Sequence, residues 1–280
     1  AWQMGLENPL TGKGWGLFEL FYPFYQGPLL LAVDTFRVLR THANNAHNEV
    51  LEVFSQTGLL GLGVFVWLWT TFTAAFRRRA RGPGEWARWA AFAGVAGMLA
   101  DNLMNVSMHF AVPAFLFWWQ AGTVVAPAEG ESGRWRSWRL PAAASLALWV
   151  AVVAAAGWGG AGWTRQWLRE TDYFAGFKRI RQGQVADAVR VLEEAHRSDP
   201  REVNTNYELG NAYARSQDFT KALWAYDEAL RANCGYDEIF YNKASLYANH
   251  MGRPQEALTN YRMAYAINPL NKDTVAGLIN

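Results

Sequence analysis

Residues 44–76 read NNAHNEVLEVFSQTGLLGLGVFVWLWTTFTAAF, and this stretch decides how the first half of the chain is expected to fold. Its last part, Leu59–Phe76, carries no charge over 18 residues. A helix rises about 1.5 Å per residue, so this part is close to the roughly 30 Å thickness of the hydrocarbon core of a bilayer. The stretch therefore predicts a membrane-spanning helix that begins in a polar segment.

The polar start of this helix contains the candidate catalytic residue. Asn44 or Asn45 is expected to cap the helix, because a short side-chain oxygen satisfies an unpaired N–H group of the first turn. His47 would then lie in the first turn, where the positive end of the helix dipole disfavours protonation and attracts anions. Two interpretations remain open: a neutral, basic histidine beside an anion site, or a histidine that only caps or hydrogen-bonds at a membrane interface.

Three further apolar segments follow, at about residues 86–104, 112–125 and 140–158. Clusters of arginine flank them, at residues 77–81 and 134–139. Cytoplasmic loops are enriched in Lys and Arg, so both clusters are expected in the cytoplasm. The sequence therefore predicts about four membrane spans, with His47 and everything after Trp163 in the periplasm.

The composition divides the chain into an apolar first part and a polar helical remainder, which the mean hydropathy of -0.11 averages together. The net charge is only +2, and most clustered arginines flank apolar segments, which favours membrane topology over nucleic-acid binding. The lone Cys234 rules out an intramolecular disulfide and a multi-cysteine metal site, and neither a metal nor a cofactor is expected. Because Ala1 opens a loop-like segment without an initiator methionine or signal peptide, we expect the C-terminal piece of a longer protein.

From about residue 169 the chain repeats itself with a period of 34 residues. Small residues recur where paired helices approach closely, and large residues recur where they fill the space between helices. This period is typical of tetratricopeptide repeats, and three units are near the minimum for a stable stack. The recurring pairs are Gly176 with Gly210, Ala188 with Ala222, Leu192 with Tyr226 and Ala195 with Ala229, followed one residue late by Ala257, Tyr261 and Ala264.

Three aromatic residues within the repeats, Tyr207, Trp224 and Tyr241, have two interpretations. They form either a binding surface or part of the repeat core. Aromatic residues at helical spacing more often belong to the core.

Other polar residues supply candidate binding groups. Asn8–Gly16 contains three glycines and Lys13, a spacing that suits either an anion-binding backbone or an ordinary tight turn. Arg37 and Arg40 concentrate positive charge shortly before the first apolar segment. Asp101 falls late in the second apolar segment, where a carboxylate is costly unless it faces protein or water. It either forms a polar wall of the histidine's cavity or bonds one helix to another.

Residues 1–125 resemble the O-antigen ligase family, which includes lipopolysaccharide ligases, O-antigen polymerases and protein O-oligosaccharyltransferases. Residues 2–6 together with 8–14 are similar to the beginning of the family's large periplasmic loop. Residues 46–48, Leu51 and residues 58–61 are similar to the end of that loop, and residues 101–118 to the family's penultimate polar hairpin. A C-terminal tetratricopeptide tail is a known variant within this family.

The resemblance implies metal-independent transfer of a glycan, with inversion, from an undecaprenyl-pyrophosphate carrier to a hydroxyl of an acceptor lipid or protein. It also implies a bacterial inner membrane and contact with membrane lipid. His47 matches the family's essential histidine, as general base toward the acceptor or as the group that orients it. The further substrate-binding candidates are Asn48, Lys13, Arg37, Arg40 and Asp101.

Two functions from different classes follow. The first is a membrane glycosyltransferase of the O-antigen ligase type. The second is a membrane-anchored tetratricopeptide scaffold that recruits periplasmic protein partners. The His47–Asn48 pair favours the enzyme, because a pure anchor would not need it. Both functions share an all-α architecture: a periplasmic loop at residues 1–58, transmembrane helices at 59–160, and a tetratricopeptide α-solenoid at 161–280.

Overall fold

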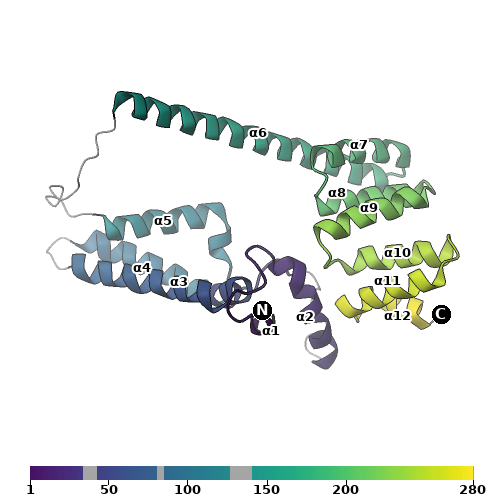
Figure 1. Cartoon of the computed structure of the whole chain (residues 1–280), viewed down its shortest axis with the longest axis horizontal. Helices are drawn as coiled ribbons and strands as arrows, with labels where there is room; N and C mark the ends of the chain where they lie inside the picture. Colours follow the sequence, from purple (N-terminus) through teal and green to yellow (C-terminus); the bar gives the residue numbers. More distant parts are fainter. Residues whose placement is uncertain (34–42, 81–84, 127–140, 280) are drawn as a thin grey trace. The chain divides into compact units, whose positions relative to one another are not determined.

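The computed structural model describes residues 1–33, 43–80, 85–126 and 141–279, and every regular element in these ranges is helical (Figure 1). The predicted all-α class is therefore confirmed. The chain divides into two compact units, and the boundary between them falls within α2 (Phe18–Ala32). Unit 1 comprises Ala1–Tyr25 and His42–Ser137, and unit 2 comprises Gln26–Thr41 and Trp138–Asn280.

Unit 1 is built on three packed helices, α3 (Glu49–Arg79), α4 (Trp86–Asp101) and α5 (Ala111–Val125). A short helix, α1 (Trp2–Glu7), contacts α3, and a 3-10 helix, η2 (Ser107–His109), leads into α5. The buried apolar core of the three helices consists of Phe72, Phe76, Ala91, Val95, Phe117, Ala121 and Val124.

The start of α3 differs from the prediction. Asn48 is the N-cap, because its backbone is extended and its Oδ1 accepts a hydrogen bond from Leu51 N at 2.9 Å. The expected caps, Asn44 and Asn45, are therefore wrong. His47 lies before the cap with a positive φ of 49°, outside the first turn of the helix.

Two of the described helices are long and apolar enough to cross a membrane, namely α3 and α6 (Ala142–Arg181). Only 6% of the most apolar 18-residue window of α3 is buried, and none of that of α6, so neither window is the core of its unit. α4 and α5 have 16 and 15 residues and rise only about 24 and about 22 Å. The prediction of four spans is therefore not supported.

Two arginines near the ends of α3 and α4 bind the C-terminal end of α5. Arg79 donates to Val125 O, and Arg88 donates to Val124 O and Ala126 O at 2.7 and 2.8 Å. These carbonyls have no partner within their own helix, and cationic donors stabilise them. The first arginine cluster thus serves helix packing as well, and the second, at residues 134–139, lies outside the described residues.

Unit 2 is a stack of helical hairpins that begins in the second half of α6 (Figure 1). α6 pairs with α7 (Val185–Ser198), α8 (Val203–Arg215) with α9 (Phe219–Ala232), and α10 (Asp237–Asn249) with α11 (Pro254–Ile267). The last helix, α12 (Lys272–Ile279), packs on α11. The predicted repeat units are therefore confirmed as hairpins.

The turn inside each hairpin uses a residue of positive φ. Gly183, Gln217 and Gly252 have φ values of 77°, 64° and 63°, and they stand 34 and 35 residues apart. Glycine adopts this conformation without the steric cost that a Cβ imposes. The chain reversal thus follows the same period as the core residues.

α6 joins the apolar segment to the repeats without a break. It has 40 residues and is therefore about 60 Å long. Its first part is exposed and apolar, whereas Gly176 near its end packs on Leu192 of α7. The expected domain boundary at residue 161 lies within this helix. The division into three domains stays a prediction.

Candidate functional site

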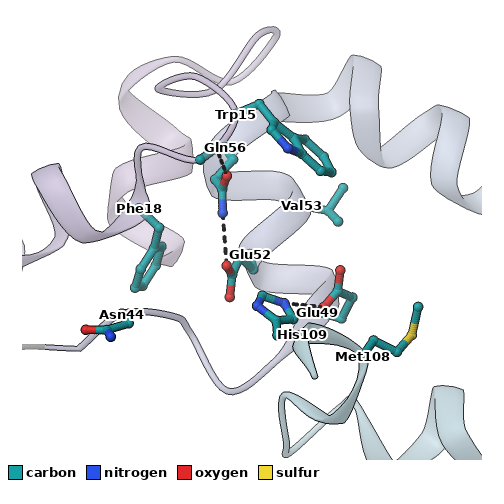
Figure 2. A pocket seen from close by; sticks show the side chains of 10 residues that line it. Trp15, Phe18, Asn44, Glu49, Glu52, Val53, Gln56, Met108 and His109 are labelled. Carbon is teal, nitrogen blue, oxygen red and sulfur yellow. Dashed lines mark hydrogen bonds and ion pairs between the residues drawn. The ribbon is translucent and has the colours of Figure 1, made fainter. Parts of the chain in front are cut away.

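Unit 1 contains a cavity of about 470 Å³ at the start of α3 (Figure 2). The first turns of α3, the loop before α2 and the 3-10 helix η2 provide its walls. Its lining residues are Trp15, Gly16, Phe18, Asn44, Glu49, Glu52, Val53, Gln56, Met108 and His109.

The polar groups of this cavity bind one another. Glu52 accepts from Ala46 N at 2.9 Å and from Gln56 Nε2 at 3.0 Å, while the Gln56 Oε1 accepts from Gly16 N. Glu49 Oε2 pairs with His109 Nε2 at 3.2 Å. These bonds tie the preceding loops and η2 to α3. Within the described ranges, no group of three or more His, Cys, Asp or Glu residues is arranged to hold a metal ion.

None of the predicted site residues that the structure describes lines this cavity. His47 does not line the cavity, although His109 does. Asn48 caps α3 and donates to Leu103 O at 2.8 Å. Asp101 is exposed and accepts from Ser107 Oγ at 2.5 Å, a bond within the turn after α4. Two further candidates, Arg37 and Arg40, lie outside the described residues.

Lys13 and the glycine-rich loop pack against a kink in α3. Lys13 N and Gly14 N donate to Ser55 O and Gln56 O at 3.0 and 2.9 Å, next to Gly58 with its φ of 64°. The Lys13 ammonium pairs with Glu7 at 2.5 Å. These two N–H groups serve the kink instead of an anion, so the tight-turn interpretation of the loop agrees with the structure.

A second polar site lies in the repeats, between α8, α9 and α10, and we call it the amide cluster. Asn211 Oδ1 accepts from Tyr226 Oη at 2.7 Å and from Asn242 Nδ2 at 3.1 Å. Asn211 Nδ2 donates to Glu208 Oε2 at 3.2 Å. Tyr207 completes the cluster, and its ring centroid lies 6.3 Å from that of Tyr226.

Burial determines the electrostatics of the amide cluster. The Glu208 side chain belongs to a residue only 9% exposed, and burial raises the pKa of its carboxyl. Burial likewise raises the pKa of the Tyr207 phenol. Asn211 and Asn242 remain partly accessible, so their neutral amide groups are exposed in part beside an incompletely solvated carboxylate.

The three aromatic residues of the repeats are divided between core and surface. Tyr207 and Tyr241 are half-buried and pack against the repeat core, whereas Trp224 is 42% exposed. Sequence reasoning missed Asn211 and Asn242. Their 31-residue separation does not match the repeat period. The available signal was that the first helix of each of two successive hairpins carries an asparagine within two residues of a small residue, Gly210 in α8 and Ala244 in α10.

The hairpins and their periodic turns define an array of tetratricopeptide repeats. Residues 179–238 and 207–272 match the family model described as tetratricopeptide repeat. These ranges include the last turn of α6 and the helices α7 to α11.

Two curated relatives are similar to part of the chain. Superkiller complex protein 3 from Homo sapiens is 31% identical over 121 residues, which is 42% of this chain and 7% of the human protein. The same protein from Mus musculus is 31% identical over 119 residues, with the same coverage. The chain thus spans about 7% of the length of these relatives.

Several solved structures are similar to part of the chain. The second tetratricopeptide domain of human RPAP3, in complex with an HSP70 peptide, has 16% identity and a TM-score of 0.39 over 41% of this chain and 95% of that chain. The Yersinia enterocolitica type III secretion chaperone SycD, with a peptide of the translocator YopD, has 16% identity and a TM-score of 0.38 over 39% and 88%. YrrB, a tetratricopeptide protein with an unusual peptide-binding site, has 15% identity and a TM-score of 0.39 over 75% and 98%.

These findings correct the family resemblance inferred from residues 1–125. The matched family model is the tetratricopeptide repeat, and none of the similarities described here points to an O-antigen ligase. The predictions of ligase membership and of glycan transfer from a lipid-linked carrier are therefore wrong. Short motifs of common residues can coincide with a family pattern, because each motif alone carries little information.

Proposed function

We propose that the chain is a scaffold that attaches to a membrane through α3 and α6 and binds an extended segment of a partner protein on its tetratricopeptide array. The observation that carries this proposal is the array itself, in which three hairpins and a final helix stack in succession. Stacked helical repeats present extended surfaces on which partner proteins bind.

The amide cluster suits an extended polypeptide. A peptide backbone offers one N–H donor and one C=O acceptor per residue, and a side-chain amide pairs with both. Asn242 on α10 and Asn211 on α8 are partly accessible and hydrogen-bonded to each other. Their mutual bond supports a binding role because it fixes the amide orientation before a ligand arrives, which lowers the entropic cost of binding.

Membrane attachment is supported by the apolar side chains exposed along α6. Leu146, Trp149 and Val153 are 67%, 68% and 65% exposed. Water would be an unfavourable solvent for such a surface, whereas lipid is a favourable one. The bacterial inner membrane, and the periplasmic side of that membrane for the repeats, remain predictions.

Site-specific photo-crosslinking in native membranes tests the proposal. A photoreactive residue at Ser245, one turn after Asn242 on α10, should yield one discrete adduct with a protein. The same photoreactive residue in place of exposed Arg231 on α9 should yield no such adduct. Asn242→Leu, which removes the amide at similar volume, should reduce the yield of the Ser245 adduct several-fold. Equal labelling from both positions, or an adduct indifferent to Asn242→Leu, would contradict a partner-binding role of this surface.

A further inference from the structure

Glu208 is the unusual member of the amide cluster. It is 9% exposed, and its Oε2 accepts from the neutral amide of Asn211 at 3.2 Å. In the described part of the chain, no Lys, Arg or His nitrogen lies within 4.0 Å of its carboxylate. Arg215, the nearest cation on the same helix, instead donates to Ile180 O at 3.1 Å.

Several other carboxylates of the array have cationic partners. Glu170 and Glu202 lie 2.8 and 3.6 Å from the guanidinium of Arg169, and Asp227 pairs with Lys243. A largely buried carboxylate without a cation is costly, because the protein replaces its hydration only in part. A cation supplied from outside would therefore be bound more strongly at Glu208 than at the carboxylates that are already paired.

The charge of Glu208 also acts on two tyrosines. Tyr207 is its neighbour on α8, and the charge of Glu208 adds to burial in raising the pKa of the Tyr207 phenol. Tyr173, in the part of α6 that packs against the repeats, has a pKa raised to about 12, first by burial and then by the charges of Glu208 and Glu202.

We infer that a lysine or arginine side chain of the bound partner segment pairs with the Glu208 carboxylate. This inference rests on the proposed function, since it specifies the chemistry of the segment that the array binds. Within the described residues the carboxylate receives one hydrogen bond, from Asn211 Nδ2 to its Oε2, and a cationic partner would supply the charge that this neutral amide lacks.

A displayed library of random 12-residue peptides, selected on the full chain in detergent micelles, provides the test. Selected peptides should share one lysine or arginine at a fixed position. Replacing that residue by norleucine should weaken binding about 10- to 100-fold, the loss expected for a hydrogen-bonded charge pair. Glu208→Gln should weaken binding of the cationic peptide to the same degree and leave binding of the norleucine peptide unchanged.

Glu256→Gln is the control variant, because Glu256 is an exposed residue of α11 paired with Arg253. It should change the affinity of neither peptide. Selected peptides without a shared basic residue, or cationic peptides indifferent to Glu208→Gln, would overturn the inference and leave the proposed function standing. A chain that retains no peptide at all would overturn the proposed function. The norleucine comparison needs no protein variant, so it still tests the requirement for a cation if Glu208→Gln fails to fold.

Discussion

Gly210 on α8 faces the ring of Tyr226 on α9 so closely that a Cβ at position 210 would lie 2.5 Å from the ring carbons Cδ1 and Cε1. The same relationship links Gly176 to Leu192, where a Cβ would lie 2.5 Å from Leu192 Cγ. In these two hairpins a missing side chain lets the paired helices approach, and a large side chain of the partner helix fills the contact. The stability of the array thus resides in contacts within and between neighbouring hairpins.

A fragment of residues 169–280 is therefore expected to fold without the rest of the chain. Each hairpin buries its apolar face on its neighbours, and α12 covers α11 at the end of the stack. Circular dichroism should show a strongly helical spectrum and one cooperative thermal transition. A weakly helical spectrum, or melting without a cooperative step, would show that the array depends on unit 1 or on the apolar part of α6.

Gly210→Ala should destabilise this fragment by about 1–2 kcal/mol. Overpacking a tight core costs about 1–3 kcal/mol, and the better helix propensity of alanine returns up to about 1 kcal/mol. Tyr226 cannot move away easily, because it is 2% exposed and its hydroxyl donates to Asn211. Urea unfolding measures the change. Ala248→Leu, which enlarges an exposed residue of α10, should stay within about 0.5 kcal/mol of the wild type.

α6 is expected to behave as one rigid rod from its apolar part into the first repeat. Spin labels at exposed Val150 and Phe174 stand 24 residues apart on this helix and should be separated by about 36 Å. Pulsed electron paramagnetic resonance of the full chain should give one narrow distance distribution. A broad distribution, or a markedly shorter mean distance, would indicate a hinge between the apolar part and the array.

Glu208 should make the stability of the array fall as pH rises. Its pKa is raised in the folded state, so the folded chain binds a proton more tightly than the unfolded chain. The favourable contribution is complete below the ordinary glutamate pKa of 4.5 and is lost as pH rises through the folded-state pKa. Glu208→Gln should therefore gain stability relative to wild type between pH 4 and pH 7. An equal difference at both pH values would contradict this assignment, and Glu256→Gln is the control.

The array could be predicted from the sequence because its determinants are local and periodic. Gly176, Gly210 and their partners recur at a fixed spacing that reflects hairpin packing directly. The amide cluster could not, because Asn211 and Asn242 meet only through the stacking of separate hairpins, at a spacing unrelated to the period.

Unit 1 was predicted less well, for a physical reason visible at Asn48. Its side chain caps α3 and also donates a hydrogen bond to the backbone carbonyl of Leu103, 55 positions further along the chain. Tertiary contacts therefore fix the helix start. That cap leaves His47 outside the first turn and outside the cavity. Apolar composition alone predicted four spans, but α4 ends at Asp101 and is too short to be counted as one.

The most direct test compares three proteins in one titration with a fluorescent peptide selected on the array. Fluorescence anisotropy would measure the affinity of the full chain in micelles, of Asn242→Leu and of His47→Ala. If the array binds the partner segment, Asn242→Leu should weaken binding about 5- to 10-fold, the loss of one or two hydrogen bonds. His47→Ala should bind as the wild type does. A peptide affinity that falls with His47→Ala and is unchanged by Asn242→Leu would contradict the assignment of binding to the array.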